Sequence, residues 1–170
     1  MGGERGKVTV GDEVAKAKAD GIVNSGCEGG TGGRRASYIK HAGLTLEIDL
    51  AEVQKTLVVN NRRGKVYLQT DEQLKTGHDI IVAAMMGAEE FGFATSALIV
   101  LGCIMMRKCH LNTCPVGVAT QNEELRKKFI GRSEYLVNYF NFLAEEVREH
   151  LAELGVKSLN DIVGCSDWLK

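Results

Sequence analysis

Along the first two-thirds of the chain, the spacing of apolar residues switches repeatedly between helical spacing and the short apolar runs typical of strands. Apolar positions recur with helical spacing over residues 12–19, 49–58 and 79–86. Short apolar runs between and after them predict strands over residues 21–25, 65–69 and 90–93. The repeated order of strand and helix favours parallel strands joined by right-handed crossovers. The fold class predicted from this pattern is therefore α/β.

The last third of the chain has helical spacing without strands. Apolar residues recur at three and four positions over residues 133–154, at Leu136, Tyr139, Phe140, Leu143, Val147, Leu151 and Leu154. Ser133 is a candidate cap for this helix, as Asp49 is for an earlier one, and Gly155 is a stop signal. Ser158 and Asp161 have the spacing of a capping box for a last short helix. We expect a helical C-terminal region.

Three predicted strands are too few for a closed barrel, because a complete eight-fold βα barrel usually needs about 200 to 250 residues. The chain has 170 residues. We therefore predict a partial barrel built from about three βα units. Its four predicted segments are a tail at 1–11, the partial barrel at 12–102, a cysteine-rich loop at 103–121 and a helical region at 122–170.

Composition excludes several kinds of partner. Lys plus Arg number 21 and Asp plus Glu number 22, so no general positive charge attracts nucleic acid or anionic lipid. The longest uncharged stretch, 91–106, is shorter than a membrane span, and the N-terminus lacks the apolar segment of a secretory signal. We therefore predict a cytoplasmic location. In such a reducing compartment, five cysteines favour metal or redox chemistry over a disulfide framework.

Three of the five cysteines fall within one short segment, CIMMRKCHLNTCPVG. Cys103, Cys109 and Cys114 provide soft thiolate ligands, which bind iron–sulfur clusters or zinc. A zinc site would recruit His110 as a further ligand. The non-functional alternative is that the three thiols are small buried apolar groups. Pro115 follows the last cysteine, as in ferredoxin-type loops, so metal binding is the favoured interpretation.

Loops that follow the predicted strands provide candidate binding residues. Glycine-rich backbone directly after a strand suits an anion, although a flexible turn is the alternative. This first loop contributes Gly29, Gly30, Thr31 and Gly32. The next two loops contribute Asp71, Gln73, Lys75 and Gly77, and then Gly92, Ala94 and Thr95. Ordinary helix capping explains the residues of these two loops about equally well.

The stretch GAEEFGFATSALIVLGCIMMRKCHLNTCPVGVATQ at 87–121 resembles the flavin and iron–sulfur domain of the glutamate synthase large subunit. The motifs LQTDEQLKTGHDI and SYIKHAG support the same resemblance, which extends from about residue 12 to residue 164. It implies that Cys103, Cys109 and Cys114 hold a 3Fe-4S cluster. It also implies an FMN whose phosphate lies among residues 71–77 and 92–95 and beside the glycine turn at 29–32.

The implied reaction reduces the imine of 2-oxoglutarate and ammonia to L-glutamate, with electrons from an NAD(P)H reductase subunit or ferredoxin. The resemblance assigns no catalytic residue in this chain. Catalysis would need the remaining glutamate synthase segments or subunits, because the glutaminase portion and five barrel strands are not in the sequence. Glu72 replaces the glycine of the family's TDGQ motif, and its negative charge argues against tight FMN binding.

Two alternatives to this interpretation remain open. The chain could be a stand-alone iron–sulfur or metal-binding module for electron transfer, without catalysis. It could also be a structural fragment that self-associates, since an open parallel sheet leaves backbone groups unpaired at its edges.

Overall fold

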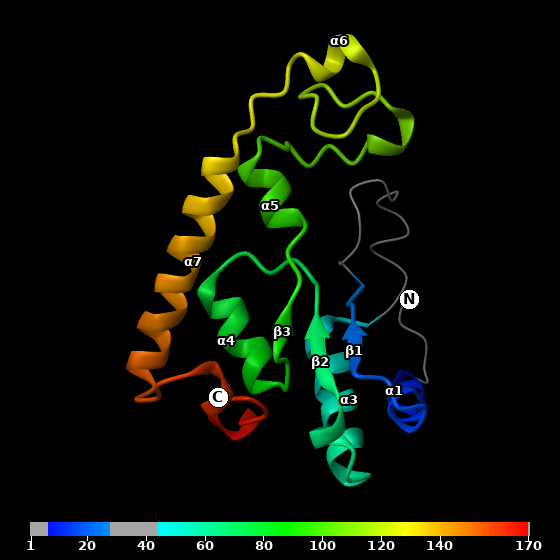
Figure 1. Cartoon of the computed structure of the whole chain (residues 1–170), viewed down its shortest axis with the longest axis vertical. Coiled ribbons are helices and arrows are strands. Elements are labelled where there is room, and N and C mark those ends of the chain that lie inside the picture. The colour runs from blue at the N-terminus through cyan, green and yellow to red at the C-terminus, as the bar shows by residue number, and fades with distance from the viewer. Residues whose placement is uncertain (1–6, 28–43, 170) are drawn as a thin grey trace.

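The computed structural model describes residues 7–27 and 44–169. Its centre is a parallel sheet of three strands in the order β1 (Gly21–Asn24), β2 (Tyr67–Thr70) and β3 (Glu90–Phe91). The strands point in the same direction, towards the top of Figure 1. Each pair of neighbouring strands is joined through helical crossovers, so the predicted α/β class and the order of its elements are confirmed.

The two faces of the sheet differ sharply in exposure. Ile22 and Leu68 pack on helix α3 (Leu46–Val59) in one apolar core. On the opposite face, Val23 is 59% exposed and Tyr67 is 60% exposed. Residues of a strand alternate between faces, so this opposite face also carries Gln69 and Glu90, and the described residues leave it largely uncovered. A parallel sheet is normally covered on both faces, which is consistent with a partial barrel.

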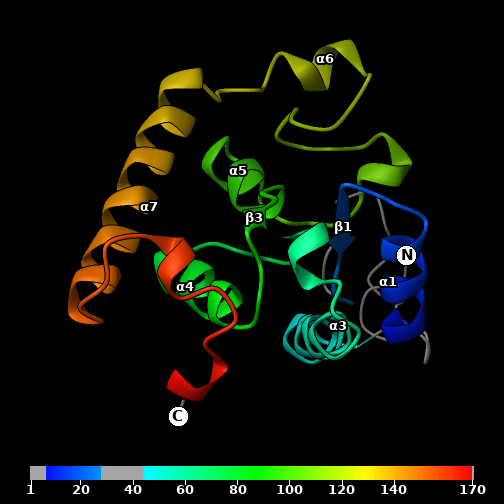
Figure 2. The same cartoon turned by 60° about the horizontal axis from the view of Figure 1, so that its bottom comes forward.

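The helices follow one another around the covered side of the sheet. Figure 2 shows this succession from α7 (Ser133–Glu153) through α4 (Gly77–Met85) and α3 to α1 (Lys7–Lys16). A second core joins α4 and α7, with Leu143 and Val147 on α7 and the fully buried Ile162 from the C-terminal region. This region contains the short helices η3 (Leu159–Asp161) and η4 (Ser166–Trp168). None of the helices in the described ranges is long and apolar enough to cross a bilayer.

A long excursion separates the sheet from α7. It begins after α5 (Thr95–Val100) and contains η2 (Cys109–Leu111) and α6 (Glu123–Arg126). We call residues 103–132 the cysteine arm. Figure 1 shows the arm beyond the carboxyl ends of the strands, so the three cysteines and the strand ends lie at the same end of the molecule.

Several predicted boundaries are wrong, for local reasons. Helix α3 begins at Leu46 with Thr45 as its N-cap, so Asp49 lies buried in the first turn and does not cap the helix. Residues 63–65 form a 3₁₀ turn, η1 (Arg63–Lys65), and strand β2 begins only at Tyr67. Ser133 is the first helical residue of α7, and Arg132 takes the N-cap position. The capping box of Ser158 and Asp161 is confirmed.

Candidate functional site

The carboxyl ends of the three strands are tied together by hydrogen bonds. The Thr70 hydroxyl, at the end of β2, donates to the carbonyl of Asn24 at the end of β1 (3.1 Å). The backbone N–H of Gly92, after β3, donates to the carbonyl of Thr70 (2.7 Å). The loops that follow the strands therefore start side by side, where ligands bind in open parallel sheets.

Asp71 and Gly92 lie against each other at this edge. A Cβ added to Gly92 would lie 2.8 Å from the Cβ of Asp71, so glycine is needed for the close approach of the two loops. The Asp71 Oδ1 atom, after β2, and the Ser96 Oγ atom, at the start of α5, are buried without a hydrogen-bond partner in the described part of the chain. A buried polar atom left unpaired costs about 1–3 kcal/mol. With the buried Asn24 Nδ2 atom at the end of β1, which also has no partner in the described part of the chain, these atoms are candidates at this edge for binding a polar group.

The start of α4 is organised by a capping box. The Asp79 carboxylate accepts hydrogen bonds from the backbone N–H groups of Lys75 and Thr76, both at 2.9 Å. The Thr76 hydroxyl accepts from the Asp79 N–H in return (3.2 Å). Burial raises the pKa of Asp79, but the hydrogen bonds with the Lys75 and Thr76 backbone and with the Thr76 side chain act in the opposite direction, and the pKa stays below its ordinary value. Ordinary helix capping therefore explains this part of the loop.

Lys75 and Gly77 are both engaged by helix α7. The Glu146 carboxylate accepts from the Gly77 N–H (2.7 Å), and the Tyr139 hydroxyl donates to the Lys75 carbonyl (2.8 Å). A Cβ on Gly77 would lie 2.8 Å from the backbone nitrogen of Val147. The structure therefore shows a packing role for Gly77, and its N–H is already used by Glu146.

Glu72 lies over the end of β1. A Cβ on Gly26 would overlap the Glu72 carboxylate, and the Cys27 thiol lies 3.9 Å from Glu72 Oε1. The Glu72 carboxylate thus occupies the space beside the start of the glycine-rich loop. Gly29, Gly30, Thr31 and Gly32 themselves lie outside the described residues.

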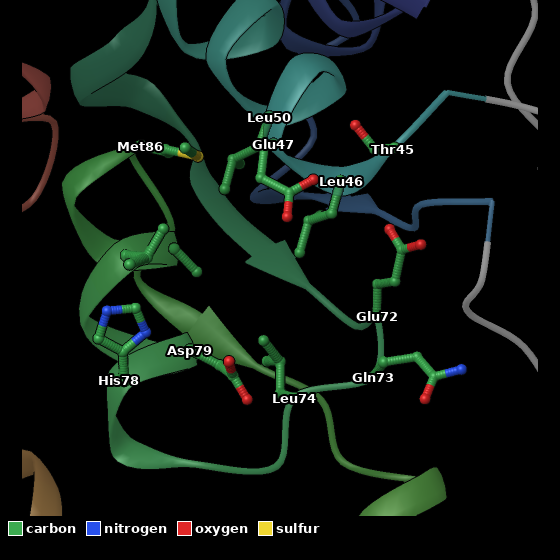
Figure 3. Close-up of a pocket in the computed structure, with 12 residues that line it drawn as sticks. Thr45, Leu46, Glu47, Leu50, Glu72, Gln73, Leu74, His78, Asp79 and Met86 are labelled. Carbon is green, nitrogen blue, oxygen red and sulfur yellow. The ribbon is translucent and has the colours of Figure 1, made fainter. Parts of the chain in front are cut away.

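A cavity of about 400 Å³ lies between α3 and α4. Figure 3 shows its lining, with Leu50 and Glu47 from α3, His78 from α4, and Glu72 and Gln73 from the loop after β2. Gln73 therefore lines this cavity between the helices, whereas Gly92 lies against Asp71. The candidate residues of the second loop are divided among three surroundings: the strand edge, this cavity and the contact with α7.

The candidate residues after β3 stand at the start of α5. Ala94 is the exposed N-cap residue, and Thr95 is the first helical residue, 9% exposed. Helix α5 thus opens directly after the loop that follows β3. The start of α5, Gly92 and Asp71 together form one part of the strand edge, and all of them belong to the described residues.

The cysteine arm holds its three thiols in different surroundings. Cys114 is buried, while Cys103 and Cys109 are partly exposed, and all three are free. The Cys103 sulfur accepts a hydrogen bond from the Met105 N–H (3.4 Å). Burial raises the pKa of Cys114, but the backbone N–H groups of residues 116–119 outweigh burial and lower the pKa. Backbone amides aimed at sulfur favour the thiolate, the form that binds metal.

The three sulfurs are not gathered into one coordination site. Within residues 7–27 and 44–169, no group of three or more Cys, His, Asp or Glu side chains could hold a metal ion. The arm therefore supplies ligands of suitable chemistry, but not a closed metal site.

Asn112 fastens the arm around Cys114. It adopts a left-handed conformation with a φ of 59°. Its side-chain oxygen accepts from the Thr120 hydroxyl (2.8 Å) and from the Gln121 N–H (2.6 Å). These bonds close the segment that contains Cys114. Gly117 is confined within it, because a Cβ there would overlap the carbonyl of Leu125.

Sequence reasoning missed the roles of Asn112, Tyr139 and Glu146. Tyr139 was predicted only as an apolar position of α7, and the sequence carries no local signal for a contact between α7 and the loop after β2. A signal for Asn112 was available, because asparagine tolerates left-handed backbone and bonds to nearby backbone groups.

Comparison with solved structures places the sheet and its helices in a known class of fold. A flavocytochrome b2 variant with sulfite bound matches with a TM-score of 0.58 and 17% identity, over 92% of this chain and 31% of that chain. A ligand-free DHODH from Eimeria tenella matches with a TM-score of 0.51 and 17% identity, over 96% and 36%. Both have folds of the TIM-barrel type. The chain thus has the fold of part of such a barrel.

Sequence comparison then identifies the family. The family model described as a conserved region in glutamate synthase matches residues 1–157, so the chain belongs to the glutamate synthase family. It is 58% identical to the glutamate synthase (NADH) of Schizosaccharomyces pombe over 98% of this chain and 8% of that protein. It is 57% identical to the glutamate synthase (NADPH) large chain of Bacillus subtilis, over 95% and 11%. A ferredoxin-dependent glutamate synthase of Antithamnion is 56% identical, over 95% and 10%. The chain spans about a tenth of the length of these relatives.

Proposed function

We propose that this chain supplies the last part of the barrel and the iron–sulfur loop of a glutamate synthase, and that it needs further segments for catalysis. The reaction would convert 2-oxoglutarate and ammonia to L-glutamate. The observation that carries the proposal is the family match, which spans all three strands and the cysteine arm. The uncovered face of the sheet supports the need for further segments, because a parallel sheet is normally covered on both faces and Val23 and Tyr67 are largely exposed here.

A 3Fe-4S cluster held by Cys103, Cys109 and Cys114 is the finer part of the proposal. The donor set fits, since three thiols and amide donors to sulfur are the surroundings that iron–sulfur clusters use. Metal binding is coupled to the folding of its ligand loop. We therefore expect cluster insertion to draw the three sulfurs of the arm together, and residues 103–121 to act as one functional segment.

An FMN site at the strand edge is supported only in part. Asp71 and Ser96 carry buried polar atoms that could bind hydroxyl or amide groups of a flavin, with Gly92, Ala94 and Thr95 beside them. The Glu72 carboxylate is unfavourable for a phosphate at the same edge. The phosphate would therefore depend on Gly29, Gly30, Thr31 and Gly32. A bound flavin would supply hydride chemistry and the cluster single electrons.

The electron donor follows from the relatives only as a class. Their names specify NADH, NADPH or ferredoxin. We propose that one of these donors, through a reductase subunit or directly, supplies electrons to the arm. A cytoplasmic location agrees with the free state of the five cysteines.

The test is to purify the chain without oxygen, alone and together with a segment that carries the preceding βα units of a relative. We expect iron and sulfide in both preparations, with an electron paramagnetic resonance signal typical of a three-iron cluster, and flavin only in the complex. Cys114→Ser should lose the iron, whereas the matched variant Cys165→Ser, outside the arm, should keep it. Zinc in place of iron, or no metal in either preparation, would contradict the proposal.

A second candidate is a stand-alone electron-transfer module. It is favoured by one observation: the arm contains all three cysteines, whereas the flavin edge is incomplete among the described residues. Such a module would hold iron alone but neither bind flavin nor form glutamate when the complementary segment is added.

A further inference from the structure

Helix α7 contacts both of the loops that form the candidate flavin edge. Glu146 and Tyr139 bind the loop after β2 through the Gly77 N–H (2.7 Å) and the Lys75 carbonyl (2.8 Å). Phe140 packs edge-on against Phe93 in the loop after β3, with ring centroids 5.3 Å apart. We call Tyr139, Phe140 and Glu146 the brace residues.

The brace residues stand on a firmly packed helix. Leu143, Val147 and Leu151 lie on the same stripe of α7 and are buried against α4 in the second core. A side chain on a helix fixed in this way loses little further entropy when it holds a loop. The loops after β2 and β3 are thus both held by one rigid helix, although they belong to different βα units.

The same helix also fixes the end of the cysteine arm. The arm ends at Arg132, the N-cap residue of α7, and the helix starts at Ser133. Figure 1 shows α7 running from the arm down past α5 to α4. A single element therefore connects the segment that contains the cysteines to both loops of the strand edge.

We propose that Tyr139, Phe140 and Glu146 are positioning residues: Tyr139 and Glu146 hold the loop after β2, and Phe140 holds the loop after β3, in a fixed relation to the cysteine arm. This inference rests on the proposed function for the identity of the bound groups. The contacts themselves are observed in the structure and do not depend on the proposed function. Substitution of the brace residues should loosen the loops first, and only through them weaken flavin binding and electron transfer from the arm.

The first experiment measures amide hydrogen exchange by NMR in the full chain without cofactors. Loss of a hydrogen bond of ordinary strength should speed exchange of the Gly77 amide roughly tenfold in Glu146→Ala. Glu146→Gln should restore slow exchange, because its side-chain oxygen can still accept. Glu149→Gln, an exposed position on the same helix, is the matched control and should change nothing.

Tyr139→Phe removes only the hydroxyl and should speed exchange over residues 74–77 by about fivefold. Tyr135→Phe is its matched control, since Tyr135 is 44% exposed. Circular dichroism and denaturant midpoints of all variants show whether α7 itself remains folded. Unchanged exchange in both Glu146→Ala and Tyr139→Phe would overturn the brace proposal.

The second experiment uses the complex with the complementary segment. The flavin dissociation constant should rise about tenfold in Glu146→Ala and recover in Glu146→Gln, while the spectrum of the cluster stays unchanged. Equal flavin affinity in all variants, despite faster exchange, would overturn the positioning role. Absence of flavin in the complex of the unsubstituted chain would instead refute the proposed function, and the exchange result would stand independently.

Discussion

Replacement of Gly77 by alanine tests the contact between α4 and α7 directly. A Cβ at this position would lie 2.8 Å from the Val147 backbone nitrogen and 2.8 Å from Glu146 Cγ. The Glu146 side chain could move, but the backbone of α7 could do so only by shifting the helix. Overpacking of this kind typically costs about 1–3 kcal/mol. Distortion of the hydrogen bond from the Gly77 N–H to Glu146 would add roughly 0.5–1.5 kcal/mol to this loss.

One effect opposes this loss. Alanine is a better helix residue than glycine by about 0.5–1 kcal/mol, and Gly77 is the first residue of α4. The net expectation for Gly77→Ala is a loss of about 1–3 kcal/mol in the free energy of unfolding. Steric conflict therefore decides the sign.

The assay is equilibrium unfolding in urea, followed by circular dichroism, with Gly64→Ala as the matched control. A Cβ on Gly64 would meet nothing within 4 Å, and the residue is exposed. Gly64→Ala should be neutral or slightly stabilising. If Gly77→Ala unfolds at the same urea concentration as Gly64→Ala, with an unchanged slope, then α7 does not pack on α4 as the structure shows.

Three further predictions concern the core, the capping box and the arm. Leu68→Ala should lower the free energy of unfolding by about 2–5 kcal/mol in the same urea assay, because Leu68 is fully buried, whereas Val23→Ala on the uncovered face should cost under about 1 kcal/mol. Asp79→Asn should destabilise the chain at neutral pH. The pKa of Asp79 is lower in the folded chain, so its stabilisation is present above the unfolded pKa of about 3.9 and is lost as pH falls through the folded value. The urea midpoints of Asp79→Asn and of the unsubstituted chain should therefore converge as the pH falls below about 4. A difference in midpoint that stays constant with pH would refute the stabilising role of the Asp79 carboxylate. Asn112→Ala should speed hydrogen exchange of the Gln121 amide roughly tenfold, while Asn112→Asp, which keeps the acceptor, should not.

The sequence by itself determined the α/β class, the order of the elements and the position of the cysteine segment. The spacing of apolar residues within each short segment distinguishes helix from strand, and this spacing depends only on residues close together in the sequence. Left-handed glycines that end helices, such as Gly87 and Gly155, are equally local signals. The candidate residues Asp71 and Gly92 were found for the same reason, since each directly follows a predicted strand.

Tertiary structure alone decided which of the candidate residues lie together. Asp71, Gln73 and Gly77 all follow strand β2. Nevertheless Asp71 lies against Gly92, Gln73 lines a cavity between α3 and α4, and Gly77 packs on α7. The contact of Glu146 with Gly77 joins residues far apart in the chain, and no local pattern records it. Side-chain direction and long-range packing are properties of the folded chain, because they depend on which distant surface each element covers.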